Sequence, residues 1–144
     1  MGRASRDRAP DTVRVKLVSL STMLCVTDVE RSTAWYRDKL GFEVLKQEPE
    51  IALLRIDSGF VYLFAESAPT EDKPSEHLVP KPGGVILVLT VEDCREAYED
   101  LRQRGVEFLT RPKSPPWGSW RCFAHDPDGY LVEIEDWAVE LHRS

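Results

Sequence analysis

The stretch HDPDGYLVEIED, residues 125–136, decides the fold because it joins a tight turn to a strand. Its DPDG segment is typical of a turn in which carboxylates accept backbone N–H groups. The letters that follow alternate apolar and polar, as a half-buried strand does. Glu133 and Glu135 are two residues apart, so they share one face of that strand. A carboxylate in this place is a candidate metal ligand, and the rest of the chain must supply the others.

The chain contains an internal repeat. Val-Thr-Asp at 26–28 matches Val-Glu-Asp at 91–93, and LGFEVL at 40–45 matches RGVEFL at 104–109. Offsets of this size, 65 and 64 residues by these numbers, are too long for a solenoid and indicate two copies of one unit. Each copy has the pattern of a strand, a helix and three strands, so the sequence predicts two βαβββ modules.

The predicted fold class is α+β. Each module can cover one face of its sheet with a helix, so the two open faces are expected to curl together as a mixed sheet around a cleft, with the helices outside. That cleft is the expected binding site. The predicted boundaries divide a single domain into a disordered arm (1–14), a first module (15–66), a Pro-rich linker (67–83), a second module (84–138) and a tail (139–144).

Local signals place the elements. Asp28 is the expected N-cap of a helix in VERSTAWYRDKL, which Gly41 ends, and Gly105 closes a second helix in EDCREAYEDLRQR. Alternating or apolar runs bounded by turn residues predict the strands. These strands are expected at 13–26, 42–49, 51–57, 58–66, 84–91, 106–112, 119–126 and 130–137.

Composition and charge limit the function. A net charge of −6 argues against nucleic acid, which requires clustered Lys and Arg, and is compatible with a cationic ligand. The chain has no apolar run of about 18 residues and no apolar segment of a secretory signal, so we expect a cytoplasmic protein without a membrane partner. Cys25, Cys94 and Cys122 form no CxxC pair, and we expect buried, reduced thiols.

Two motifs carry a family resemblance. VTDVERSTAWYRDKLGFEV, residues 26–44, and HDPDGYLVEIED resemble the opening and closing signatures of the vicinal oxygen chelate superfamily. This superfamily includes glyoxalase I, extradiol dioxygenases, fosfomycin resistance enzymes and bleomycin-binding resistance proteins. The resemblance covers residues 17–137 and implies the two-module fold. It is far less specific for activity, because one fold hosts many functions.

The resemblance also implies a metal site with one ligand, usually His or Glu, from each of four strands. The four positions fall on Ser21, Leu63 (or Tyr62 or Phe64 if the register slips by one), Ile86 and Glu133. Only Glu133 is a good donor, whereas a divalent ion needs about three or more N, O or S ligands. We therefore expect no metal and no cofactor, unless His77 in the linker or His125 beside the turn reaches inward.

The expected lining of the cleft is apolar and aromatic. It comprises Ser21, Met23, Leu63, Ile86, Trp117, Trp120 and Glu133. PPWGSW resembles a tryptophan–glycine segment of the metal-free bleomycin-resistance branch, which makes Trp117 and Trp120 candidate stacking platforms; they could equally pack at the edge of the sheet or at a dimer interface. The predicted function is the capture of a small aromatic or cationic molecule, with antibiotic resistance by sequestration as one form.

Other functions stay open at this stage. A glyoxalase-like lyase, epimerase or dioxygenase would need a metal held by recruited donors. A metal-free enzyme could instead use Glu133 as a general base, if apolar neighbours raise the pKa of its carboxyl group. The resemblance also implies a homodimer, because related proteins often complete their clefts across a two-fold axis.

Overall fold

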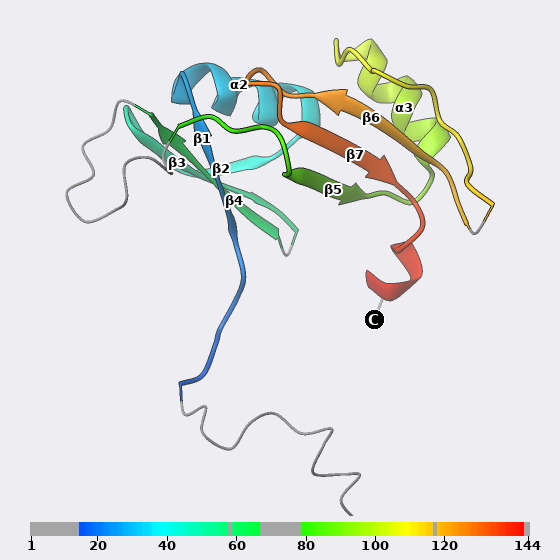
Figure 1. Cartoon of the computed structure of the whole chain (residues 1–144), viewed down its shortest axis with the longest axis horizontal. Coiled ribbons are helices and arrows are strands. Elements are labelled where there is room, and N and C mark those ends of the chain that lie inside the picture. The colour runs from blue at the N-terminus through cyan, green and yellow to red at the C-terminus, as the bar shows by residue number, and fades with distance from the viewer. Residues whose placement is uncertain (1–14, 58, 67–78, 117, 143–144) are drawn as a thin grey trace, which may run out of the picture.

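The architecture is α+β, as predicted, and its element order repeats (Figure 1). The computed structural model describes residues 15–57, 59–66, 79–116 and 118–142, so the predicted arm and most of the predicted linker lie outside the described residues. The first half contains β1 (Thr22–Val26), α2 (Val29–Leu40), β2 (Glu43–Glu48), β3 (Ile51–Ile56) and β4 (Gly59–Ala65). The second half contains β5 (Ile86–Thr90), α3 (Cys94–Gln103), β6 (Arg121–His125), β7 (Leu131–Glu135) and the 3-10 helix η2 (Val139–His142), which occupies the start of the predicted tail.

The helices begin and end where the local signals indicate. Asp28 has extended backbone, and its carboxylate accepts the N–H of Arg31 at 3.0 Å. Gly41 ends α2 with a left-handed φ of 81°, and its N–H bonds to the carbonyl of Arg37 at 3.1 Å. The carboxylate of Asp93 caps α3 in the same way. Neither helix, nor any other in the described ranges, is long and apolar enough to cross a membrane.

The strands form two open sheets, and each sheet is covered by one helix (Figure 1). The strand orders are β1-β4-β3-β2 and β5-β7-β6. In each half the first strand pairs in parallel with the last, and the other pairs are antiparallel. The mixed, curled form with outer helices is therefore as predicted.

The second sheet has one strand fewer than the sequence predicts. The expected strand at 106–112 forms one isolated bridge with the neighbouring β6, at Phe108, and Lys113 just after it forms a second. Pro112 has no N–H to contribute to a ladder. The N–H of Phe123 bonds to the hydroxyl of Thr110 at 3.1 Å, so a side chain takes the place of a backbone acceptor. The regular ladder therefore breaks between the two bridges.

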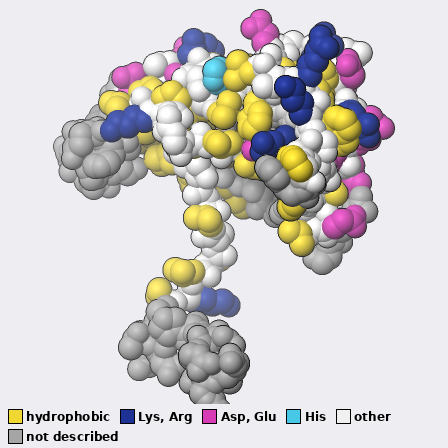
Figure 2. Space-filling view, turned by 45° about the vertical axis from the view of Figure 1, so that its right-hand side comes forward, with side chains coloured by type: hydrophobic (Ala, Val, Ile, Leu, Met, Phe, Trp, Pro, Cys, Tyr) yellow, Lys and Arg dark blue, Asp and Glu magenta, His cyan; other side chains and the backbone are white. Residues whose placement is uncertain are grey.

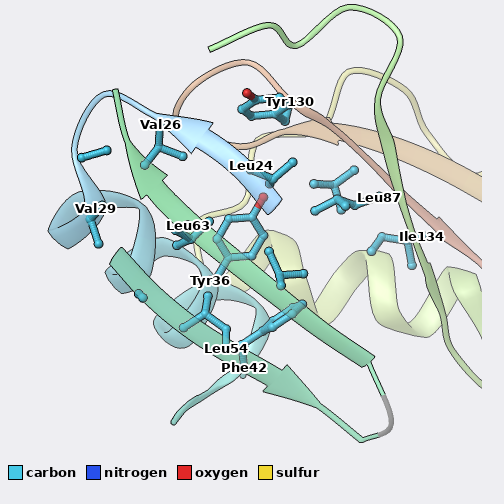
Figure 3. Close-up of a cluster of buried hydrophobic side chains, with 14 of the residues drawn as sticks. Leu24, Val26, Val29, Tyr36, Phe42, Leu54, Leu63, Leu87, Tyr130 and Ile134 are labelled. Carbon is cyan, nitrogen blue, oxygen red and sulfur yellow. The ribbon is translucent and has the colours of Figure 1, made fainter. Parts of the chain in front are cut away.

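The core lies between the sheets and the helices (Figure 3). Tyr36 is buried on α2 and packs edge-on against Phe42, with ring centroids 5.3 Å apart. Leu24 and Leu63 pair directly across β1 and β4, and both face α2. The same cluster continues into the second half through Leu87, Tyr130 and Ile134.

The three cysteines are free and buried, as predicted. Cys94 at the start of α3 and Cys122 on β6 have sulfur atoms 3.7 Å apart. The thiol of Cys94 also lies 3.4 Å from the carbonyl oxygen of Ile134. The two thiols therefore fill the space between α3 and its sheet.

The segment before β1 extends away from the body of the molecule (Figure 1). The sequence predicts a strand over 13–26, and in its described part, 15–26, the strand is limited to Thr22–Val26. A strand needs a neighbour for its backbone hydrogen bonds, and the described chain offers none to residues 15–21. The apolar residues of this segment are exposed to solvent, with exposed fractions between 69% and 92% for Val15, Leu17, Val18 and Leu20.

The DPDG turn fastens the second half to the first. The carboxylate of Asp128 accepts the N–H of Thr27 at 3.1 Å, the Thr27 hydroxyl at 2.9 Å and the Ser32 hydroxyl at 3.1 Å. The hydroxyl of Tyr130 donates to the carbonyl of Cys25 at 2.7 Å. The turn thus holds the junction of β1 and α2, which is a structural role.

Candidate functional site

A pocket of about 290 Å³ lies on the open face of the second sheet. Its lining includes Val88 from β5, Arg121 from β6, Glu133 and Glu135 from β7, and Trp120 and Trp137 from the flanking segments. The strand register explains why side chains from neighbouring strands line one pocket. Val88 pairs with Glu133, and paired residues point to the same face of the sheet. All lining residues belong to the second half, so this pocket is not the cleft between two halves that the sequence predicts.

The two carboxylates share a face, as their spacing requires, but their surroundings differ. Glu135 is buried, and its oxygens accept hydrogen bonds from the hydroxyl of Thr90 and from the N–H of Ala138 at 3.0 Å. These bonds tie β7 to β5 and to the chain that follows β7. Glu135 therefore has a structural role, because its hydrogen bonds stabilise the wall of the pocket.

Glu133 is the carboxylate that is available to a ligand. Its neighbours across the sheet are Val88 and Phe123, which are both apolar. Burial raises the pKa of the Glu133 carboxyl group, and the negative charge of Glu135 raises it further, while Arg121 lowers it. A half-buried acid of this kind can accept a proton or pair with a cation.

Trp137 forms one side of the pocket. Its side chain is 53% exposed and lies against Gly118, where an added Cβ atom would be 1.8 Å from the ring. Only glycine at position 118 leaves room for this indole. Asp136 fixes the segment, because its carboxylate accepts the N–H of Trp120 at 2.8 Å and the N–H of Cys94 at 3.0 Å.

Trp120 contributes to the pocket, but its ring is directed towards α3. The guanidinium carbon of Arg95 lies 4.4 Å from the centroid of the Trp120 ring. The ring also packs against the core cluster. Trp120, an expected stacking platform, thus has one face of its ring covered by a guanidinium group. Trp117 lies outside the described residues.

The expected lining residues of the first half do not meet the pocket. Leu63 is 0% exposed and belongs to the core, since its register with Leu24 turns it towards α2. Tyr62 pairs with Met23 on the opposite face, where Met23 is 38% exposed. The open-face position of β4 is thus Tyr62 rather than Leu63. Ser21 is exposed just before β1.

The donor set does not fit a divalent metal ion. Beside Glu133 on the open face lie Val88 and Phe123, and Ile86 is exposed further along β5. Hydrocarbon side chains offer no lone pair to a metal. Over the described ranges, no three His, Cys, Asp or Glu side chains gather closely enough to hold an ion. One carboxylate alone cannot fix the geometry of a catalytic metal.

His125 does not complete this site. His125 is at the exposed end of β6 and lines a separate hollow that also includes Trp35 and Asp126. Trp35 is the first-half residue of that hollow, and Glu133 is not part of its lining. His77, the other histidine considered as a metal ligand, lies outside the described residues.

Sequence reasoning missed Arg121 and Trp137. A signal for Arg121 was present, because it alternates with the buried Cys122 and Ala124 and so shares the face of Glu133. Trp137 had no such signal. It follows the last strand, and its direction depends on contact with Gly118, which belongs to another segment.

Comparison with known proteins identifies relatives. A model of the Glyoxalase/Bleomycin resistance protein/Dioxygenase superfamily matches residues 19–134. A lactoylglutathione lyase of Salmonella typhimurium is 30% identical over 128 residues, which cover 80% of this chain and 89% of that protein. A bleomycin resistance protein of Geobacillus stearothermophilus is 26% identical over 121 residues, 77% of this chain and 90% of its own. A solved glyoxalase/bleomycin resistance protein/dioxygenase from Nocardioides has a TM-score of 0.69 at 27% identity, over 87% of each chain.

Proposed function

We propose that this chain, which belongs to the Glyoxalase/Bleomycin resistance protein/Dioxygenase superfamily, binds a small molecule without a metal ion. The expected ligand is planar and aromatic, or cationic. The observation that carries this proposal is the pocket shared by Glu133 and Trp137. An exposed indole offers a stacking face, and a neighbouring carboxylate offers a counter-charge. With two carboxylates and one guanidinium group in its lining, the pocket favours a positive ligand.

The size of the pocket limits what it can hold. Ligand sites usually have volumes of about 300 to 1,000 Å³, and this one has about 290 Å³. It suits one or two fused rings, with the rest of a larger compound outside. The exposed side chain of Val88 provides an apolar floor beside the carboxylate of Glu133.

The finer form of the proposal is antibiotic resistance by stoichiometric capture. A relative at 26% identity is named a bleomycin resistance protein. A protein that only holds its ligand needs neither a metal nor a nucleophile, in keeping with the single available carboxylate of this pocket. The captured compound would then be a planar or cationic antibiotic.

Tryptophan fluorescence tests the binding. We expect bleomycin or a planar acridine-type cation to quench the emission of the protein on titration, and Trp137→Phe to remove most of the quenching. Trp35→Phe is the matched control, because Trp35 lies on α2 and packs against Tyr36 away from this pocket. A panel of such compounds that leaves the emission unchanged, or equal quenching in the Trp137→Phe protein, would contradict the proposal.

A second candidate is a metal-free enzyme in which Glu133 acts as a general base. The raised pKa of its carboxyl group favours this role, because a base works best when its pKa approaches the working pH. Mass spectrometry of a bound compound after long incubation distinguishes the two functions. Conversion that Glu133→Gln abolishes supports the enzyme, and an unchanged compound supports the binder. Stoichiometric zinc, nickel, manganese or iron in the purified protein would favour the metal-dependent lyases, epimerases or dioxygenases instead.

We also propose that the protein acts as a homodimer. Leu17 and Leu20 are among the most exposed apolar side chains of the described chain, and Ile86 and Val88 are exposed on the open face of the second sheet. Surfaces of this kind favour association. Sedimentation at micromolar concentration should show a dimer, and Leu17→Asp combined with Leu20→Asp should shift it to monomer. A monomeric unmodified protein would refute the dimer.

A further inference from the structure

We propose that the side of the second half that carries α3 binds a small organic phosphate, at a site beside the pocket of Glu133, with which it shares Trp120. The site is a hollow of about 530 Å³ between α3 and the segment before β6, with Arg95, Arg102 and Arg111 in its lining. A hollow of about 290 Å³ adjoins it, lined in part by Arg111, Lys113 and Arg121. We call these five cationic residues the arginine surface, and Arg111 belongs to both hollows.

The arginine surface is cationic although the whole chain has a net charge of −6. Glu99 is the carboxylate in the lining of the larger hollow, against three arginines, and the lining of the smaller hollow contains cationic side chains without a carboxylate. Figure 2 shows several Lys and Arg side chains on the side of the molecule that carries α3, with Asp and Glu side chains beside them. The local potential is therefore positive and attracts an anion.

Two aromatic rings hold guanidinium groups in place. Arg95 lies 4.4 Å from the ring centroid of Trp120, and Arg102 lies 5.4 Å from that of Tyr98. A stacked guanidinium group keeps its N–H edges turned away from the ring, and such an edge matches two oxygens of a phosphate. Because the rings already restrict these side chains, less conformational freedom is lost when an anion binds.

Two of the three arginines have no carboxylate partner among the described residues. Arg102 is paired with Glu99 at 3.3 Å. In the part of the chain that the structure describes, no carboxylate lies within ion-pairing distance of Arg95 or Arg111, although both line the larger hollow. A bound phosphate would therefore meet two guanidinium groups that no carboxylate of the described ranges neutralises.

The occupant that fits is small. Nucleic-acid binding requires a long run of basic contacts, whereas this chain has 25 acidic and 19 basic residues, and the larger hollow is lined by three arginines. A volume of about 530 Å³ is that of a site for a drug-sized molecule. Inorganic pyrophosphate, which has two adjacent phosphate groups, is the simplest probe of this chemistry.

Calorimetric titration with pyrophosphate tests the site, with sulfate at equal ionic strength as the reference anion. We expect pyrophosphate to bind more tightly than sulfate, and Arg111→Ala or Arg95→Ala to weaken it at least tenfold, as charge-assisted bonds to phosphate require. Glu99→Gln should tighten binding, because it releases Arg102 from its ion pair. The matched control is Arg37→Ala, since Arg37 is exposed on α2 and paired with Asp38.

Three results would overturn this site: equal affinity for sulfate and pyrophosphate, unchanged affinity in Arg111→Ala, or tighter binding of a short oligonucleotide than of pyrophosphate. Arg95 and Arg111 are not in the lining of the Glu133 pocket. Quenching by a planar cation is therefore expected to survive Arg111→Ala, so the two proposals can fail independently.

Discussion

The phenolic hydroxyl of Tyr36 donates a hydrogen bond of 2.6 Å to the carboxylate of Asp126, a residue 90 positions later in the chain. Both groups are buried, and the bond joins α2 to the DPDG turn. Burial raises the pKa of the Asp126 carboxyl group, and the hydrogen bond from Tyr36 lowers it. One contact thus couples the two halves of the molecule.

Tyr36→Phe should destabilise the protein. The substitution leaves a buried carboxylate with one donor fewer, which lowers the free energy of unfolding by about 1 to 3 kcal/mol. It should also raise the pKa of Asp126 further. Urea unfolding followed by circular dichroism measures the first effect, and Tyr98→Phe, on the half-buried face of α3, is the control. Equal stability of the Tyr36→Phe and unmodified proteins would show that the bond contributes nothing.

Asp128→Ala should weaken the same junction. The substitution removes the acceptor of two hydroxyl groups and one backbone N–H, supplied by Thr27 and Ser32. Loss of these charge-assisted bonds should lower the free energy of unfolding by about 2 to 3 kcal/mol. Asp100→Ala breaks only the exposed pair with Arg104 and should change stability by less than about 0.5 kcal/mol. Similar losses in the two variants would contradict this difference.

Leu63→Ala and Met23→Ala separate the core from the open face. Leu63 is fully buried, so its truncation should cost about 2 to 5 kcal/mol of stability. Met23 is exposed on the other side of the sheet, and its truncation should cost less than about 1 kcal/mol. Denaturation midpoints of the two variants check this order, and a reversed order would place Leu63 on the open face.

Gly118→Ala should displace Trp137. The new methyl group would overlap the indole ring, which is half-exposed and can swing outwards. We expect a red-shifted tryptophan emission and weaker binding of a planar cation, with little loss of global stability. Gly83→Ala is the matched control, because a Cβ atom at position 83 meets no atom within 4 Å. An unchanged emission spectrum in Gly118→Ala would show that the two residues are not in contact.

Glu133→Gln should stabilise the protein at neutral pH. Because burial raises the pKa of Glu133 in the folded state, the folded protein holds this proton more tightly than the unfolded chain does. The unmodified protein therefore loses stability as the pH rises from the ordinary pKa of Glu through the raised one, and the amide does not. The advantage of Glu133→Gln should vanish in acid, below the ordinary pKa of Glu. An advantage that persists there would mean that charge is not its cause.

The sequence by itself determined both helices, most of the strands and the repetition of the pattern. Asp28 and Gly41 set the limits of α2 because capping and a left-handed φ depend on atoms within one helical turn. The alternation around Glu133 and Glu135 fixed their common face for the same local reason. The predicted strand at 106–112 was wrong because a ladder also needs donors and acceptors in the right places on both strands.

The lining of the pocket was decided only by the tertiary structure. Leu63, rather than Tyr62, faces the core because the register between β1 and β4 sets its direction. Trp137 reaches the pocket because Gly118 leaves room for its ring, and Asp136 holds this segment to the start of α3 through Cys94, 42 residues away. The direction of these side chains depends on contacts with residues that are distant in sequence. The local sequence pattern does not predict such contacts.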